Sequence, residues 1–322
     1  MDTISNIASY YNISSEVLRK HYKNKVSEYS SWGQKDHAAH YLIYEQNIGP
    51  YLSIDELSLS KGELYTYITN KEKKGKKGTL VASVKGTKSE DIIKVLAKIP
   101  LEKRKKVKEI TLDMANNMEL AARMSFPEAI LTTDHFHVIK LAMEAMQHVR
   151  VKLRWEELDK ENNAIKLAKE SGKKYIPILH HNEDTPKQLL ARSRYIVAKR
   201  RDEWTPNQTE RAEILFKTYP VLLKAYNHVM QLRGIYKNTA KEKAKAELIE
   251  WLDETKKIDI KEFRTVAYTI KTKIQTILNY FQNRSTNANA ESFNAKIKLF
   301  RANLRGVKEI PFFLFRLEKL FA

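Results

Sequence analysis

Residues 51–59 read YLSIDELSL, and this stretch decides the fold. Its apolar side chains at Leu52, Ile54 and Leu57 predict a β-strand of the core. Asp55 lies inside that strand, where a carboxylate is costly to bury unless it is paired or binds a cation. The stretch therefore predicts both a core strand and a candidate site residue.

Two further strands follow, at residues 65–69 and 79–84. Short turns join them to the first strand, which predicts an antiparallel meander. The turn at residues 70–78, NKEKKGKKG, is interpreted as a solvated loop tip, with contact to nucleic-acid phosphates as an alternative.

Strand and helix patterns alternate after the meander. We expect a helix at residues 89–97, a strand at 107–112, a helix at 118–124 and a strand at 129–133. The order β-β-β-α-β-α-β predicts an α/β fold with a mixed five-stranded sheet and helices on its faces.

The remaining segments are predicted to be helical. From residue 138 to about 280 apolar residues recur at helical spacing, and breakers divide the segment at Gly172, Pro177, Pro186, Pro206 and Gly234. Residues 289–304 predict a last helix, followed by an aromatic tail. At the N-terminus, residues 3–11 and 16–29 predict two short helices separated by Asn12-Ile13-Ser14, the outline of a helix-turn-helix. Its second helix carries the candidate DNA-binding residues Arg19, Lys20 and Lys23.

Charge gives the first indication of function. The 322 residues include 58 Lys and Arg against 39 Asp and Glu, a formal charge of +19. Such a basic chain favours nucleic acid as a partner over a merely lysine-rich surface. Cysteine is absent, which excludes disulfides and cysteine-based zinc sites and fits a reducing cytoplasm. We see no signal peptide and no transmembrane run, and expect a cytoplasmic, nucleoid-associated protein without a membrane partner.

Candidate metal ligands stand at strand ends. Asp113 follows the strand at 107–112, at an edge where α/β sheets place their sites. With Asp55 it could share Mg²⁺ or Mn²⁺, because hard cations take oxygen ligands, and a two-ion site suits phosphodiester chemistry. Strand-end aspartates also serve as turn residues or caps, and that interpretation stays open.

The helix at residues 289–304 has two faces. An apolar stripe, formed by Phe293, Ile297, Phe300 and Leu304, is predicted to face the core. A second face carries one acid followed by amide and cationic groups: Glu291, Asn294, Lys298, Arg301 and Arg305. A carboxylate for a metal followed by groups that hold a DNA backbone fits phosphoryl transfer to DNA. A solvated face with a glutamate favoured by the helix dipole is the alternative.

The sequence DHFH at residues 134–137 is another dense group. We expect Asp134 and His137 to support the site, since His is a poor partner for Mg²⁺. A zinc hydrolase is the weaker interpretation, because neither a His-Glu-x-x-His helix nor cysteine ligands are present.

Four blocks together resemble one family. They are YLSIDELSL at 51–59, ITLDMANNM at 110–118, FPEAILTTDHFHVIKLAMEAMQHVR at 126–150 and NRSTNANAESFNAKIKLFRANLRG at 283–306. The chain resembles, over residues 45–320, the insertion-sequence transposases of the ISL-three type, in the Mutator-like group of DDE enzymes.

The resemblance implies an RNase H-like catalytic domain interrupted by an all-helical insertion. It implies that Asp55, Asp113 and Glu291 are the catalytic metal ligands for two Mg²⁺ or Mn²⁺ ions, and that Asp134 and His137 match an Asp-x-x-His signature. Asp134 is the alternative second ligand; we expect Asp113, because the fourth strand adjoins the first in an RNase H-like sheet.

The implied organisation has four segments. These are a helix-turn-helix-like segment at 1–45, the first part of the core at 46–142, the insertion at 143–280 and the final core segment at 281–322. Longer family members begin with a cysteine zinc ribbon, so we expect either a separate end-recognition protein or a truncated element. The expected partners are double-stranded DNA, both terminal inverted repeats and target, and a second copy of the chain.

Two other functions are weighed against the transposase. One is a catalytically inactive, transposase-derived DNA-binding protein, which metal-dependent nicking would distinguish. The other is an RNase H-type nuclease, which would act on RNA–DNA hybrids but not on duplex DNA.

Overall fold

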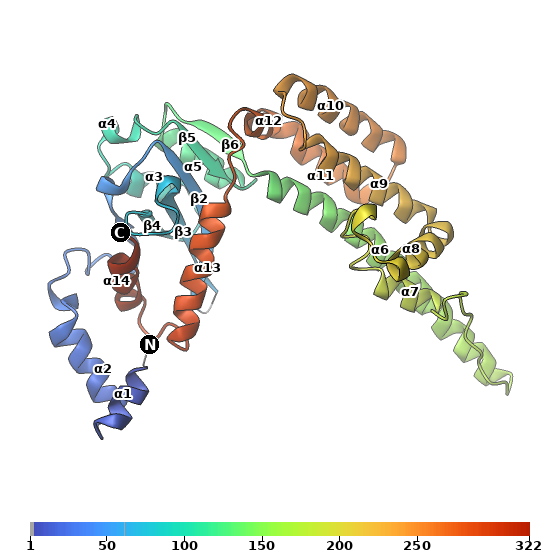
Figure 1. Cartoon of the computed structure of the whole chain (residues 1–322), viewed down its shortest axis with the longest axis horizontal. Coiled ribbons are helices and arrows are strands. Elements are labelled where there is room, and N and C mark those ends of the chain that lie inside the picture. The colour runs from blue at the N-terminus through green and yellow to red at the C-terminus, as the bar shows by residue number, and fades with distance from the viewer. Residues whose placement is uncertain (1–2, 61) are drawn as a thin grey trace. The chain divides into compact units, whose positions relative to one another are not determined.

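The computed structural model describes residues 3–60 and 62–322. The chain folds into two compact units (Figure 1). Unit 1 comprises Met1–Asp134 and Ser285–Ala322, and unit 2 comprises His135–Arg284. Unit 1 contains the sheet and unit 2 is helical.

Within the described residues, six strands of unit 1 form one mixed sheet in the order β1-β4-β3-β2-β5-β6. The strands are β1 (Tyr41–Ile43), β2 (Tyr51–Ser60), β3 (Glu63–Asn70), β4 (Leu80–Lys85), β5 (Glu109–Leu112) and β6 (Ile130–Thr133). Strands β2, β3 and β4 form the predicted antiparallel meander, and β5 and β6 add in parallel beside β2. The prediction of a mixed sheet is confirmed.

The predicted number of five strands is wrong. The additional strand, β1, pairs antiparallel with β4 at the edge of the sheet. It is only three residues long, which is too short for an alternating pattern to be recognised in the sequence.

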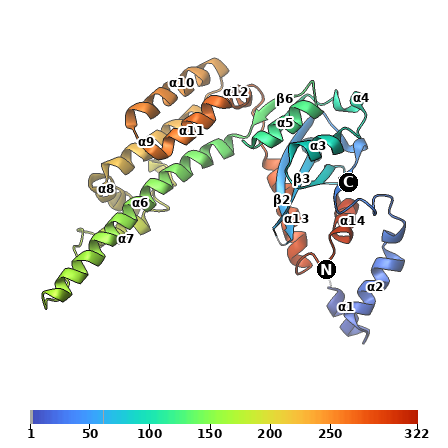
Figure 2. The ribbon, with the colours of Figure 1, turned by 180° about the vertical axis from the view of Figure 1, so that it is seen from behind.

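Helices cover both faces of the sheet (Figures 1 and 2). They are α3 (Ser89–Leu96), α4 (Leu101–Arg104), α5 (Asn116–Ser125), α13 (Ala288–Asn303) and α14 (Ile310–Phe321). One core packs Ile54, Ile110 and Leu131 of the strands against α3 and α5. The other core packs Leu57 and Tyr67 against α13 and α14.

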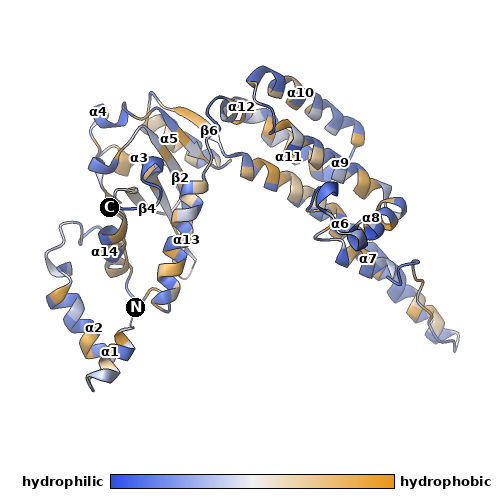
Figure 3. Cartoon of the chain, in the orientation of Figure 1, coloured by the Kyte–Doolittle hydropathy of each residue, from blue (hydrophilic) through white to orange (hydrophobic). Residues whose placement is uncertain are grey.

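The last two helices carry the predicted apolar stripe and the aromatic tail. Apolar and polar patches alternate along α13 (Figure 3). Phe293 and Ile297 of the stripe are fully buried, while Phe300 and Leu304 pack at the margin of the same core. The tail is not irregular but forms α14, because its apolar residues repeat at helical spacing and reach the sheet.

The N-terminal segment contains the two predicted helices, α1 (Ile4–Tyr10) and α2 (Ser15–His21). Thr3 and Ser14 cap them with their hydroxyl groups. The second helix ends earlier than predicted, passing through a π-helical turn at Tyr22–Val26 before Glu28 adopts a left-handed backbone conformation with φ of 61°.

Within the described residues, the regular elements of unit 2 are all helices, joined by irregular segments such as residues 171–185. Its helices are α6 (His135–Glu170), α7 (Pro186–Arg192), α8 (Pro206–Thr218), α9 (Pro220–Ile235), α10 (Lys241–Ile258), α11 (Lys261–Thr272) and α12 (Ile274–Asn283). Pro186 and Pro206 begin helices as predicted, each preceded by a threonine in a capping box. Gly234 is the second-last residue of α9, and the next helix begins only at Lys241, so a helix boundary falls at this breaker as predicted. In the described part of the chain, no helix is both long and apolar enough for a membrane span.

A buried carboxylate joins two segments of unit 2. The side chain of Asp184 is fully buried, and it forms ion pairs with Arg192 and, at 2.7 Å, with Arg211. Burial by itself raises the pKa of Asp184, but the hydrogen bond and charge of Arg211, followed by Arg192, outweigh it and hold the pKa below its usual value. The carboxylate is therefore ionised when folded and holds the start of α7 to α8.

Replacing Asp184 by Ala should lower the free energy of unfolding by about 2–3 kcal/mol, within the range for hydrogen bonds to charged groups. Because the pKa is depressed in the folded state, this stabilisation is present above the unfolded-state pKa of about 3.9 and is lost as the pH falls through the lower folded value. Urea unfolding at pH 7 and at acidic pH measures both effects.

The matched control is Asp253→Asn, which removes an exposed carboxylate paired with Lys256 in the same unit. It should leave the unfolding midpoint unchanged. Equal midpoints for wild type and Asp184→Ala at pH 7 would contradict this account.

Candidate metal centre

Strands β2, β5 and β6 are parallel neighbours in the sheet; β5 ends at Leu112 and β6 at Thr133, while β2 continues to Ser60. Their register aligns one residue from each strand in a row: Ser53, Thr111 and Thr132. Two residues beyond that row stands an aspartate in each case: Asp55, Asp113 and Asp134. The backbone hydrogen bonding between β5 and β6 extends to Asp134, whose N–H donates to the carbonyl oxygen of Leu112 at 3.0 Å. Parallel pairing thus brings three aspartates side by side.

Helix α13 packs on the sheet beside β2 and contributes to this region. The side-chain amide of Asn294 donates to Asp55 Oδ2 at 2.7 Å. Glu291 lies one turn earlier on the same helix, in its first turn. The apolar stripe of α13 fixes this placement, because burying Phe293 and Ile297 turns the neighbouring polar face toward the strand ends.

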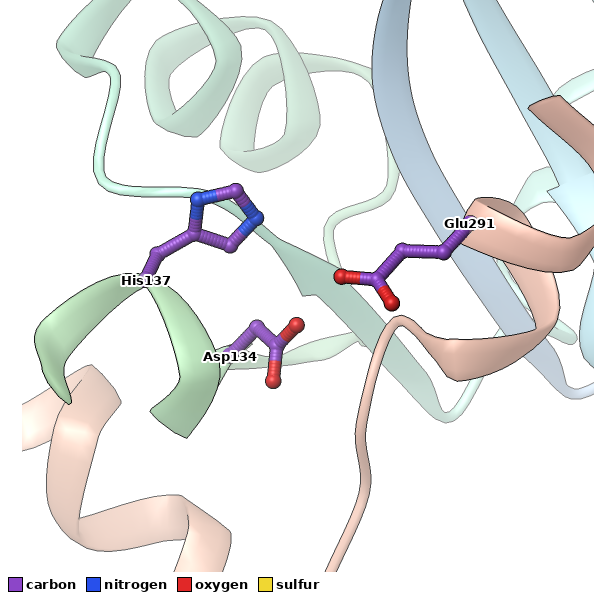
Figure 4. Close-up of side chains that lie close together, drawn as sticks. All are labelled: Asp134, His137 and Glu291. Atoms are coloured by element: carbon purple, nitrogen blue, oxygen red, sulfur yellow. The ribbon is translucent and has the colours of Figure 1, made fainter. Parts of the chain in front are cut away.

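Asp134, His137 and Glu291 lie close together (Figure 4). Each offers one ligand atom, and these atoms all lie within 4.8 Å of one another. Among the described residues this is the one group of three or more His, Asp or Glu side chains that could hold a metal ion. Asp134 is buried, His137 follows it on the first turn of α6, and Glu291 is exposed. Glu291 therefore lies with both residues of the predicted supporting pair, Asp134 and His137.

Asp55 and Asp113 lie outside that group. Asp113 Oδ1 accepts a hydrogen bond from the backbone N–H of Ala115 at 2.8 Å, in the turn that leads into α5. Burial, followed by the charge of Asp113, raises the pKa of Glu56 on the adjacent strand. The structure thus places Asp113 beside β2, as predicted from strand adjacency, with its carboxylate in a local turn.

The predicted DNA-binding residues of α13 differ in exposure and in the contacts that they form. Asn294 is buried and bonded to Asp55, which gives it a positioning role at the sheet. Arg301 donates to the carbonyl oxygen of Ser58 at 3.4 Å. Lys298 and Arg305 are exposed, and neither forms an ion pair within the described chain.

Two of the three predicted cations of the N-terminal segment are already paired. Lys20 lies 3.3 Å from Glu16, and Lys23 forms an ion pair with Glu309. Arg19 is half-buried. Their role in DNA binding stays a prediction.

Lys71 and Glu109 form a buried ion pair beside the strand ends, and this pair was not predicted from the sequence. Lys71 begins the turn after β3, and its Nζ donates to Thr111 Oγ1 at 2.7 Å and lies 3.7 Å from Glu109 Oε1. The side chain of Lys71 is 11% exposed and that of Glu109 is 2% exposed. Burial lowers the pKa of Lys71, and the charges of Glu109 and Asp134 oppose this shift.

The interpretation of residues 70–78 as a solvated loop tip is therefore wrong for Lys71. The signal in the sequence was Glu109, an acid at the start of a core strand, because a buried carboxylate requires a partner. The partner is 38 positions earlier in the chain, so no local pattern connects the two residues.

The donor set fits a divalent cation. Two carboxylates supply hard oxygen ligands for Mg²⁺ or Mn²⁺, and an imidazole is compatible with Mn²⁺. The buried side-chain oxygens of Asn287 and Asn294, near the start of α13, lack a hydrogen-bond partner within the described residues. One member of the cluster, Glu291, is exposed, so the cluster is accessible from solvent.

A family model described as transposase, of the DDE type of the ISL-three family, matches residues 52–317. The chain belongs to this transposase family. The match contains all three strand-end aspartates and Glu291. The predicted family membership is confirmed.

One curated relative is the transposase for the insertion sequence element IS1001 of Bordetella parapertussis. It is 21% identical over 273 residues, which cover 84% of this chain and 61% of the relative. The chain thus spans less than two thirds of the length of that transposase. No solved structure matches the chain significantly.

Replacing Lys71 by Met should destabilise the transposase by about 3–5 kcal/mol, because it leaves a buried carboxylate without its partner. The double variant Lys71→Met/Glu109→Met should recover most of that loss, since well-packed apolar residues can replace a buried ion pair. Urea unfolding of the single and double variants measures the coupling. If the losses of the two single variants simply add, the two residues do not act as a pair.

Replacing Glu291 by Gln, or Asp134 by Asn, should weaken Mn²⁺ binding by at least about tenfold, because each removes an anionic ligand while keeping the side-chain shape. Titration calorimetry with Mn²⁺ on the full chain measures this without any DNA. Glu72→Gln, which removes an exposed acid of the same unit, is the control and should bind Mn²⁺ like wild type. Unchanged Mn²⁺ affinity in both ligand variants would rule out this cluster as the metal site.

Proposed function

We propose that this transposase cleaves DNA at the ends of an insertion sequence and joins the freed ends to target DNA, using divalent metal ions. The observation that carries the proposal is the Asp134–His137–Glu291 cluster, beside the ends of the parallel strands β5 and β6. Family membership supports the reaction class, and the formal charge of +19 supports a polyanionic substrate.

The proposed metal ligands are Asp55, Asp113 and Glu291, with Asp134 and His137 beside them. Two Mg²⁺ or Mn²⁺ ions need more carboxylate oxygens than one pair of aspartates supplies. The aligned aspartates together with Glu291 would provide those oxygens, and grouping Asp134 with Glu291 favours a direct role for Asp134. Bound ions would activate the attacking hydroxyl and stabilise the leaving oxygen.

The residues of the chain have distinct tasks in this proposal. The ammonium group of Lys71 balances part of the charge of Asp134. Asn294 orients Asp55 through its amide hydrogen bond. Lys298, Arg301 and Arg305, further along α13, hold backbone phosphates of the DNA and keep it in register with the strand ends.

We further propose an RNase H-like catalytic domain in unit 1, interrupted between β6 and α13 by unit 2 as an all-helical insertion. The parallel placement of β5 beside β2 supports this assignment. Two transposon ends must be brought together, so the active form is a dimer on DNA. A separate protein that recognises the transposon ends is a further proposed partner.

Cleavage of a duplex carrying the terminal inverted repeats, with Mg²⁺ or Mn²⁺, tests the proposal. Glu291→Gln and Asp113→Asn should lower the rate by roughly 10²–10³-fold, the loss typical when one group that stabilises transition-state charge is removed. Both variants should still bind the duplex. Full cleavage by Glu291→Gln would refute the assignment of the site.

Asp134→Asn completes the comparison and separates the two candidate second ligands. If Asp113→Asn cleaves normally while Asp134→Asn does not, Asp134 is the second ligand and the assignment of Asp113 fails. If the wild-type chain binds the ends but never cleaves them in either metal, the chain is an inactive, transposase-derived DNA-binding protein.

A further inference from the structure

Unit 2 contains a pocket that no catalytic role accounts for. Its volume is about 210 Å³. Four cationic side chains line it, together with a tyrosine and a glycine: Arg200, Arg201, Arg233, Lys237, Tyr226 and Gly234. All six belong to the same compact unit, so the pocket is complete within it.

Two segments build the pocket. Tyr226, Arg233 and Gly234 lie on α9 at spacings of seven and eight residues, which places them on one face two turns apart. Arg200 and Arg201 come from the start of a short 3-10 turn, Arg201–Glu203. The guanidinium of Arg201 lies 5.9 Å from the ring centroid of the buried Tyr226. A side chain added at Gly234 would meet no atom within 4 Å, so this wall of the pocket is open.

The pocket carries excess positive charge. Arg200 lies 2.9 Å from Asp202 and 3.3 Å from Glu203, so its charge is balanced. Arg201 instead contacts the amide oxygen of Asn227 at 3.4 Å, and Arg233 donates to the carbonyl oxygen of Ala198 at 3.2 Å. Within the described residues, neither of these two arginines nor Lys237 forms an ion pair with an acid. The four cationic side chains of the pocket thus carry more charge than Asp202 and Glu203, the two acids that pair with Arg200, can balance.

A helix dipole does not explain this cluster. It would favour Arg233 and Lys237, which stand at the C-terminal end of α9, but not Arg200 and Arg201, which reach the same pocket from another segment. Convergence of cations from two segments on one hollow is what an anion site requires. The volume is below the roughly 300–1,000 Å³ of pockets for drug-sized ligands, so it suits a single phosphate group.

We propose that this pocket holds a backbone phosphate of DNA, so that the helical unit binds the substrate independently of the metal centre. The guanidinium groups of Arg201 and Arg233 supply paired donors that match phosphate oxygens, and Lys237 adds a point charge. The inference rests on the proposed function in one respect, that DNA is the substrate.

The test is binding of the full chain to a fluorescent DNA duplex, measured by anisotropy between 50 and 200 mM salt in EDTA. Arg233→Gln/Lys237→Gln should weaken binding several-fold and reduce the slope of log affinity against log salt by about one, the change for one lost phosphate contact. Gly234→Glu should weaken binding similarly, because it places a carboxylate in the pocket without removing any cation.

The matched control is Lys173→Gln/Lys174→Gln, which removes the same charge from exposed positions of unit 2 outside the pocket. It should leave the salt slope as in wild type. An unchanged slope in both pocket variants overturns the proposal, and so does an equal change in the control, which would indicate a general effect of net charge. Circular dichroism verifies that each variant is folded.

Failure of this inference and failure of the proposed function are distinguishable. Binding in EDTA does not require the metal centre, whereas cleavage does. If Glu291→Gln cleaves normally but the pocket variants still lose their phosphate contact, the phosphate pocket stands and the assignment of the metal centre fails. If the pocket variants bind as wild type while Glu291→Gln loses cleavage, the reverse holds.

Discussion

The parallel pairing of β2, β5 and β6 is the constraint on which the site depends. It aligns Asp55, in the middle of β2, with Asp113 and Asp134, which directly follow β5 and β6, and so places the three aspartates side by side. Gathering like charges is unfavourable unless cations or donors compensate. The structure supplies compensation from two sides, with the ammonium of Lys71 below and the amide of Asn294 on α13. The arrangement leaves capacity for divalent cations at the exposed side.

Helix α13 links the hydrophobic core to the chemistry. Its apolar stripe is buried against β2 and β3, so its rotation about its own axis is fixed by the core. That rotation sets where Glu291 points, because the two faces of one helix cannot turn separately. A loss of packing at Phe293 would therefore disturb the site without touching a ligand. The bond between Asn294 and Asp55 joins residues 239 positions apart and fixes the helix along the strand.

The connection to unit 2 is made at the candidate metal centre itself. The chain leaves unit 1 directly after Asp134 and returns at Ser285, six residues before Glu291. Two residues of the cluster thus flank the entire helical unit. The carboxylates of Asp134 and Glu291 lie close together, so the two segments of unit 1 that flank unit 2 in the chain meet at this cluster. The helical unit has its own core around Trp251, Tyr226 and Phe263.

The sequence by itself determined the elements and the chemical class. Alternating strands, the helical stripe of residues 293–304 and the strand-end acids are local patterns, and each is visible because its period or its cost of burial is local. The four sequence blocks, taken in their order along the chain, were sufficient to predict the family. The short edge strand β1 was not predicted, because a strand of three residues is too short to show an alternating pattern.

Only the tertiary structure decided which charged groups meet. It paired Lys71 with Glu109, turned Asn294 inward to Asp55, and grouped Asp134 and His137 with Glu291. It also brought Arg200 and Arg201 to the face of α9 that carries Arg233. The physical reason is that electrostatic partners are selected by distance in space, and strand register and helix rotation, which set those distances, are consequences of packing between segments far apart in the chain.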